Sequence, residues 1–338
     1  MKTGTGTLDD VDHGLVHALQ IDGRAPFRLI GEALGVSEST VARRYRRLRS
    51  AGTLRVAGTL NGARLGHHAW TIRLRCTPDA AGPLATALAA RTDTSYVHLL
   101  SGGTEISCSA QTPTADESEA LLLHKLPRTA RVTSVSAHLL LDHYALPNTW
   151  AGPTRLTREQ TALLTPPGPL ADGADDAAGE AGPCGGALVG PADRPLFDVL
   201  ARDGRAGYPE LAAAAGCSES TARRRVAALR RAGVLTFLVD IPPAALGFRA
   251  EARLWMSVRP SRLTAVAAAM AEHPEVSLVA LTTGPTNLLA AVNCRDSVHL
   301  ARYLTGRIAA LDAIRSIETA PVIRTVKRAG ALLPRPAR

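Results

Sequence analysis

The chain contains one sequence segment twice, and this repeat constrains its fold more than any other feature. Residues 19–54 and 200–235 align without a gap at an offset of 181, and half of the 36 aligned positions are identical. The densest match, from Gly35 to Arg44, reads G-x-S-E-S-T-x-x-R-R in both copies. The 338 residues are therefore expected to form two halves that carry the same module, each long enough for its own core.

The repeated module has the pattern of short helices joined by tight turns. A first helix is expected over 8–21, and the Asp-Gly-Arg sequence at 22–24 interrupts it. A second helix is expected over 27–34, followed by a turn at Gly35. Ser37 is a favourable N-cap for a third helix, whose apolar residues recur at helical spacing. This arrangement is typical of a helix-turn-helix.

The third helix carries the side chains that a DNA-reading helix needs. Short polar residues at its start can contact base edges, and arginines further along can contact phosphates. A solvated basic helix is the alternative interpretation, but identical polar starts in both copies favour DNA binding. The candidate residues in the first copy are Ser37, Ser39, Thr40, Arg43, Arg44 and Arg47. Those in the second copy are Ser218, Ser220, Thr221, Arg224 and Arg225.

The two third helices are not equivalent. Arg46 and Arg47 of the first copy correspond to Ala227 and Ala228 of the second. We therefore hypothesise that the two halves read different half-sites, so that the operator is an imperfect palindrome.

After the module, each half changes to alternating strands and helices. Residues 67–76 alternate as a half-buried strand should, and the segments that follow predict the order βαββαβ. Weaker similarity repeats this order in the second half. A small wing strand is expected over 54–60. We thus predict an α+β fold with two winged helix-turn-helix domains and two ferredoxin-like βαββαβ domains in tandem.

The domain boundaries follow from these patterns. The winged helix-turn-helix domains are expected over 1–62 and 192–243, and the βαββαβ domains over 63–147 and 244–329. Glycine or proline occupies 12 of the 28 positions in 165–192, so residues 148–191 are expected to be a flexible linker, and 330–338 a tail.

Charge and cysteine usage limit the classes of partner. The net charge is +9, and only three of the 39 basic residues are lysines, which favours a nucleic acid partner. The five cysteines contain no C-x-x-C pair, so neither a disulfide framework nor a zinc site is expected. No cofactor or metal is predicted. No apolar run is long enough to span a membrane, and a cytoplasmic location is expected.

The sequence lacks the motifs of two common enzyme classes, the phosphate-binding enzymes and the serine hydrolases. It contains no phosphate-binding glycine loop and no G-x-S-x-G nucleophile turn. His67, His68, His138 and His143 fall in or beside expected strands, where a packing role is the commoner one. No catalytic residue is therefore predicted.

The motifs L-x-x-x-G-R, G-x-S-E-S-T-x-x-R-R and L-x-x-A-G-x-L, followed by βαββαβ, resemble the Lrp/AsnC (leucine-responsive, feast/famine) transcriptional regulators. The resemblance covers nearly the whole chain, twice, whereas the common family member has half this length. It implies a winged helix-turn-helix that precedes an effector-binding and oligomerising domain. The implied partners are double-stranded DNA, an amino-acid-like effector and self-association through the βαββαβ domains.

The same resemblance implies where an effector would bind. Residues 283–289 look like the family's T-G-x-Y-D turn, with Thr286 in place of the aromatic residue and Asn287 in place of the acid. The corresponding segment of the first half is 101–105. The implied effector-binding residues are Gly102, Thr104, Glu105, Gly284, Thr286 and Asn287.

Two alternatives from other classes stay open. Some relatives of this architecture resemble sirohaem decarboxylases, which are also found as tandem fusions. A small-molecule sensor that keeps its helix-turn-helix only as a scaffold is the other alternative. Neither needs two arginine-rich helices, so both are less favoured than a DNA-binding regulator.

Overall fold

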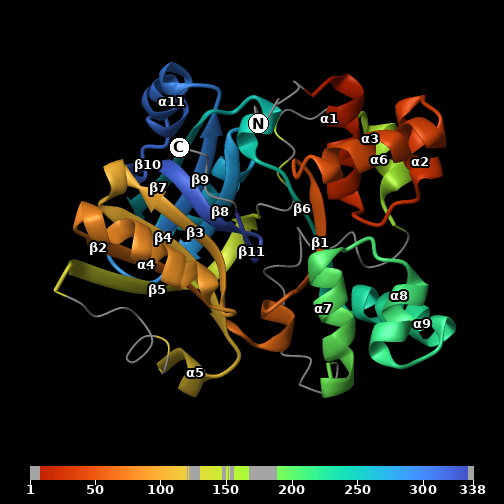
Figure 1. Ribbon diagram of the computed structural model, residues 1–338. Coiled ribbons are helices and arrows are strands. Elements are labelled where there is room, and N and C mark those ends of the chain that lie inside the picture. The colour runs from red at the N-terminus through yellow and green to blue at the C-terminus, as the bar shows by residue number, and fades with distance from the viewer. Residues whose placement is uncertain are drawn as a thin grey trace. The chain divides into compact units, whose positions relative to one another are not determined.

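The computed structural model describes residues 8–119, 121, 130–146, 150, 152, 156–166 and 189–333 (Figure 1). Contacts divide the chain into two compact units, and each unit combines segments from both halves. The helical unit contains Met1–Arg64 and Pro147–Phe248. The sheet unit contains Leu65–Leu146 and Arg249–Arg338.

The helical unit contains two copies of the three-helix module. The first consists of α1 (Asp10–Ile21), α2 (Phe27–Leu34) and α3 (Glu38–Ser50). The second consists of α7 (Arg194–Arg202), α8 (Tyr208–Ala215) and α9 (Glu219–Arg231). Gly35 and Gly216 end α2 and α8 with φ of 67° and 62°, a left-handed conformation that glycine adopts without strain. The predicted helix-turn-helix is confirmed in both halves.

An additional helix, α6 (Arg158–Leu164), packs against the first module. It lies within the segment that was expected to be a flexible linker. Thr157 and Gln160 form a capping box at its start, and Leu156 and Leu164 are buried in the core of the first module. This part of the segment therefore has regular structure, whereas residues 167–188, where glycine and proline concentrate, lie outside the described residues.

The strands expected to be separate wings pair with each other. β1 (Arg55–Leu60) and β6 (Leu235–Asp240) form an antiparallel two-stranded ribbon. Pairing of the two strands satisfies backbone groups that a lone strand would leave exposed. The register places Arg55 opposite Asp240 and Thr59 opposite Thr236, and at the offset of 181 these are equivalent pairs. The two modules are therefore related by a pseudo-two-fold axis through the ribbon.

The sheet unit has the predicted βαββαβ order in both halves. The first half contributes β2 (His68–Cys76), α4 (Pro78–Ala90), β3 (Thr94–Leu100), β4 (Glu105–Thr112), α5 (Ala115–Glu119) and β5 (Val132–Ala145). The second contributes β7 (Ala250–Val258), α10 (Leu263–Ala271), β8 (Val276–Thr282), β9 (Leu288–Cys294), α11 (Ser297–Tyr303) and β10 (Ile314–Arg328), and then β11 (Ala331–Leu332). Only α5 is described of the second helix of the first half, because 120 and 122–129 lie outside the described residues.

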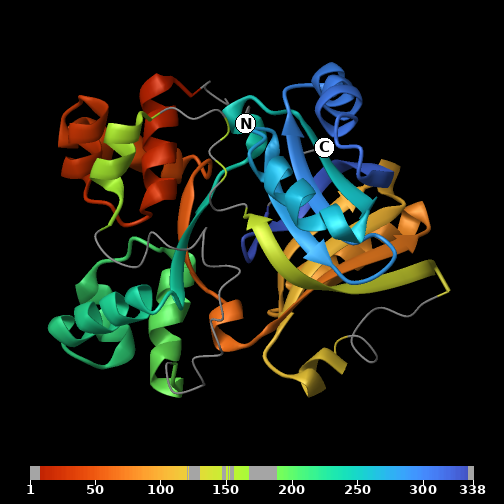
Figure 2. The same ribbon diagram turned by 180° about the vertical axis from the view of Figure 1, so that it is seen from behind.

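The long last strand of each half joins the two halves (Figure 2). β5 pairs first with β2 of its own half and then with β8 of the other. In the same way β10 pairs with β7 and then with β3, so the ladder of strands closes on itself. Leu100, Trp255, Leu289 and Ala320 form a small core where the halves meet. No helix among the described residues is long and apolar enough to cross a membrane.

Candidate DNA interface and effector turns

The starts of α3 and α9 have the same hydroxyl cluster. Ser37 caps α3 by accepting a hydrogen bond from the Thr40 amide, and its Oγ lies 2.9 Å from the hydroxyls of both Ser39 and Thr40. Ser218, Ser220 and Thr221 repeat this geometry at α9. Ser37 and Ser39 are exposed, as are all three residues of the α9 cluster, while Thr40 is half-buried. Each helix thus presents hydroxyl groups at the end that a major groove would meet first.

Arg43 and Arg224 are exposed at equivalent positions one turn further along. Within the described part of the chain, neither guanidinium has an ion-pair or hydrogen-bond partner. A guanidinium held free in solvent can take a phosphate without breaking an internal bond. These two arginines have the placement that sequence analysis expected of a DNA contact, and their DNA contact stays a prediction.

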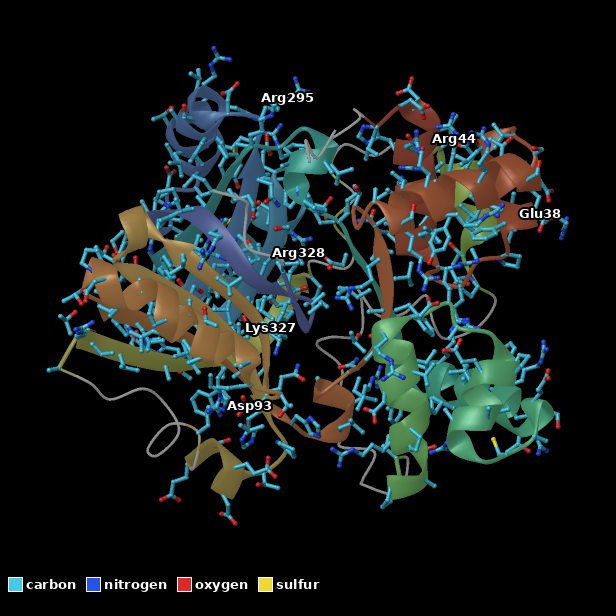
Figure 3. The ribbon with its side chains drawn as sticks, in the orientation of Figure 1. Glu38, Arg44, Asp93, Arg295, Lys327 and Arg328 are labelled. Carbon is cyan, nitrogen blue, oxygen red and sulfur yellow. The ribbon has the colours of Figure 1, made fainter. Side chains whose placement is uncertain are left out.

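Arg44 differs from its neighbour because it pairs with acidic residues at the start of the module. Its Nη1 lies 2.6 Å from Oδ2 of Asp9 and 2.9 Å from Oδ1 of Asp12. Asp12 is 1% exposed and also accepts a hydrogen bond from Arg47. Figure 3 labels Arg44 on α3. Arg44, a candidate DNA contact from the sequence, therefore also fastens α3 to α1.

The second module repeats this pairing with Arg225 and Asp193. Nε and Nη2 of Arg225 each donate a 2.6 Å hydrogen bond to Asp193, one to each carboxylate oxygen. These bonds hold the pKa of Asp193 below its ordinary value. Asp193 corresponds to Asp12 at the repeat offset. Neither acid was predicted as a partner of these arginines, although the two acids occupy equivalent positions of the repeat.

The turn of the first half that was expected to bind an effector is held by ion pairs. Gly102 has a φ of 73°, and the buried carboxylate of Glu105 accepts hydrogen bonds from Arg73 and from the Ser101 hydroxyl. Arg73 also donates to Glu318 of β10, and hydrogen bonds from Arg73 lower the pKa of that carboxyl. The backbone carbonyl of Ser101 accepts from the Thr104 hydroxyl. The acid of this turn is thus neutralised within the protein.

The turn of the second half has no charged side chain of its own. Gly284 has a φ of 100°, and a Cβ there would lie 2.3 Å from the ring of His138, so the close approach requires glycine. Asn287 binds the backbone of Val258 through both its amide atoms, at 2.8 and 2.9 Å. The Thr286 carbonyl accepts from Thr282. The side chain of Asn287 therefore fixes the turn to β7.

This second turn lies against the other half of the sheet unit. Leu139 on β5 exchanges two hydrogen bonds of 3.0 Å with Thr283, one to its hydroxyl and one from its amide. The contact of His138 with this turn was not predicted from the sequence. The two expected effector turns are therefore equivalent in position and different in chemistry.

One buried histidine of the sheet unit is held in its neutral form. Nε2 of His98 lies 2.7 Å from Nη2 of Arg253, and its Nδ1 lies 3.0 Å from the hydroxyl of Thr325. Because arginine only donates, Nε2 accepts and Nδ1 carries the proton. Burial, with Arg253 nearby, lowers the pKa of His98 well below its ordinary value. Among the described residues, no group of three or more metal-binding side chains is close enough together to hold a metal.

Family models match three segments of the chain. The AsnC-type helix-turn-helix domain matches residues 8–49 and 192–230, which cover the modules of both halves. The Lrp/AsnC ligand binding domain matches residues 251–332, in the second half of the sheet unit.

Curated relatives are regulators of about half this length. An uncharacterised HTH-type transcriptional regulator of Pyrococcus abyssi is 33% identical over 139 residues, which are 41% of this chain and 87% of the relative. The HTH-type transcriptional regulator LrpA of the same organism is 27% identical over 141 residues, 41% of this chain and all of that protein.

Among solved structures, the siroheme decarboxylase NirDL has a TM-score of 0.60 at 14% identity, with 95% of this chain and 93% of that chain covered. At this identity the likeness concerns the fold alone. The observed architecture agrees with the two helix-turn-helix matches and with the ligand-binding match. It also agrees with the sequence identity to the Pyrococcus regulators. The chain is a tandem member of the Lrp/AsnC family of helix-turn-helix transcriptional regulators.

Proposed function

We propose that the chain is a sequence-specific DNA-binding transcriptional regulator that reads double-stranded DNA with α3 and α9. The observation that carries the proposal is the equivalence of the two exposed surfaces, each with a hydroxyl cluster followed by an arginine that has no partner among the described residues. B-DNA accepts an α-helix in its major groove and presents phosphates on both sides of it. A chain that carries two such helices in one unit needs no second subunit to read two half-sites.

We further propose that the sheet unit binds a small effector of the amino-acid type at one or both turns. An amino acid needs a cation for its carboxylate and an anion for its ammonium group. At the first turn, Arg75 and Glu318 pair at 2.7 Å and are 54% and 48% exposed, so a zwitterion can compete for both. The second turn offers Gly284 and the neighbouring His138 ring instead. Calorimetry with the twenty amino acids tests this, and the absence of heat from all would contradict it.

Self-association through the sheet unit is supported by exposed apolar residues at equivalent positions of its two long strands. At an offset of 182, one more than in the helical modules, Val135 and Leu141 on β5 correspond to Ile317 and Ile323 on β10. Leu141 and Ile323 are 58% and 55% exposed, and such repeated apolar positions favour a symmetric contact with other copies of the chain.

Replacing Leu141 and Ile323 by glutamate is expected to reduce the solution mass to that of one chain, because a contact between copies would bury four charges per pair of chains. Light scattering during gel filtration measures the mass. The matched control is Ser134→Glu with Ser316→Glu, which adds the same charge at exposed, equivalent positions of the same strands. An unchanged mass in the Leu141 and Ile323 variant would contradict the proposed contact.

A sirohaem decarboxylase activity is the second candidate. It is supported by the likeness of fold to NirDL and by Arg73 and Arg253, whose guanidinium groups lie, with the neutral His98, where the two halves of the sheet unit meet. The DNA-binding proposal predicts retention of duplex DNA at low ionic strength and no absorbance change with an iron-uroporphyrin analogue. The opposite pair of results would favour the enzyme. Neither DNA nor tetrapyrrole binding, together with heat from an amino acid, would favour the sensor.

A further inference from the structure

The Asp-Gly-Arg turns of the two modules bind each other reciprocally. Arg24 donates hydrogen bonds to the backbone carbonyls of Gly204 and Ala206, at 2.6 and 3.0 Å. Arg205 donates to the carbonyls of Gly23 and Ala25, at 2.8 and 2.9 Å. At the offset of 181 these four bonds form two equivalent pairs, so each arginine clasps the turn of the other module. We call Asp22–Ala25 and Asp203–Ala206 the clasp.

The clasp also binds α3 and α9, the helices proposed to read DNA, which we call the reading helices. Arg230 on α9 pairs with Asp22 at 2.8 Å, and Arg49 on α3 pairs with Asp203 at 2.9 Å. Each reading helix is thereby fastened, near its C-terminal end, to the turn of the opposite module. The placement of α3 relative to α9 consequently depends on these contacts.

Aromatic rings cover the clasp arginines. The Arg205 guanidinium lies 4.3 Å from the centre of the Phe27 ring, and that of Arg24 lies 5.1 Å from the Tyr208 ring. Both arginines are half-buried, and burial lowers the pKa of each. Their donors are used on carbonyls of the partner module, so they differ from the open guanidinium groups of Arg43 and Arg224.

The glycines of the clasp allow the modules to approach closely. A Cβ on Gly204 would lie 3.0 Å from the backbone of Ala57 and Gly58 on β1. A Cβ on Gly23 would lie 2.6 Å from Cβ of Phe237 on β6. The turns therefore sit directly on the β1–β6 ribbon, and a side chain at either glycine would push the modules apart.

We propose that the clasp sets the distance and rotational phase between the two half-sites that one chain can read. This inference rests on the proposed function, because it assigns to the clasp the geometry of DNA recognition. Half-sites must lie on one face of the duplex, and inserting one base pair turns them by about a tenth of a helical turn. A rigid pair of reading helices tolerates little such change, whereas modules released from each other tolerate more.

The test replaces Arg24 and Arg205 by alanine and measures binding to duplexes in which the spacing between half-sites is lengthened or shortened by one or two base pairs. The natural chain is expected to prefer one spacing by about tenfold, because only then do both helices bind together. The double variant is expected to lose this preference while it retains its affinity for a single half-site. Arg28→Ala with Arg202→Ala, which removes two exposed arginines of the same unit, is the matched control and keeps the preference.

Hydrogen exchange without DNA tests the clasp independently of function. Amides of residues 55–60 and 235–240 are expected to exchange about tenfold faster in the double variant, since bonds from a charged donor to two carbonyls are lost on each side. Arg24→Lys with Arg205→Lys, which keeps the charge but not the two-pronged donor, is expected to change exchange in the same direction. Unchanged exchange would overturn the clasp itself.

The two experiments distinguish the role of the clasp in half-site spacing from the proposed DNA-binding function. Faster exchange with an unaltered spacing preference would overturn the role of the clasp in spacing and leave the proposed function standing. Failure of the natural chain to bind any duplex would overturn the proposed function and the spacing role together, while the exchange result alone would still decide whether the clasp joins the modules.

Discussion

Replacing Arg44 and Arg47 together by alanine is expected to lower the free energy of unfolding of the helical unit by about 3–5 kcal/mol. The carboxylate of Asp12 is 1% exposed, and these two arginines are its cationic partners. Removing both leaves a buried charge that the interior cannot solvate, which is costlier than the loss of an exposed ion pair. Urea unfolding, followed by circular dichroism, measures the change.

The matched control removes Arg43 and Arg46 from the same helix. Both are exposed, so the net charge falls equally while no buried acid loses its partner. Its free energy of unfolding is expected to change by less than about 0.5 kcal/mol. Equal destabilisation by the two double variants would mean that net charge, and not the pairing with Asp12, decides the stability of this unit.

The second large effect is expected on DNA affinity. Arg43→Ala with Arg224→Ala removes the two open guanidinium groups, one from each reading helix. If each contacts one phosphate, the slope of log affinity against log salt falls by about 1.8, which corresponds to roughly 60-fold weaker binding at about 0.1 M salt. Fluorescence anisotropy with a labelled duplex at several salt concentrations measures both quantities.

A control for charge alone comes from the sheet unit. Arg262 and Arg315 are exposed there, and neither belongs to a reading helix. Replacing both by alanine lowers the net charge of the chain by the same two units. This variant is expected to keep the slope of the natural chain. An equal fall in both variants would show that long-range attraction by net charge, rather than contact, explains the binding.

The elements that local patterns determine were predictable. Alternation marked the strands of the sheet unit, and helical spacing with Ser37 and Gly35 marked the helix-turn-helix, because capping and periodicity depend on near neighbours in sequence. The repeat located the second module without further argument. The fold class and the family could therefore be predicted from the sequence.

Pairings between distant segments were not predictable in the same way. Arg44 appeared on the open side of its helix because helical spacing does not show that Asp12, which is 32 residues earlier, lies beside it. The strand at 55–60 was expected to form its own wing, since nothing local says that its partner is β6. Asn287 was assigned to an effector by resemblance, and nothing local indicated that its amide binds the backbone of Val258.

Arginines occupy different positions on the two reading helices, and we therefore predict that the two helices bind DNA unequally. Arg46 is exposed on α3, and its counterpart Ala227 carries no charge. Because α9 in turn carries Arg223 and Arg231 where α3 has Ala42 and Ser50, the charges lie at different positions on the two helices, and the two half-sites are expected to be protected unequally.

Hydroxyl-radical footprinting of the natural chain on a genomic fragment selected by its own binding tests the central claim most directly. The account predicts two protected half-sites on one face of the duplex, contributed by the two helices of a single chain and protected unequally. Protection of one isolated half-site per chain, or no protection at low ionic strength, would contradict it.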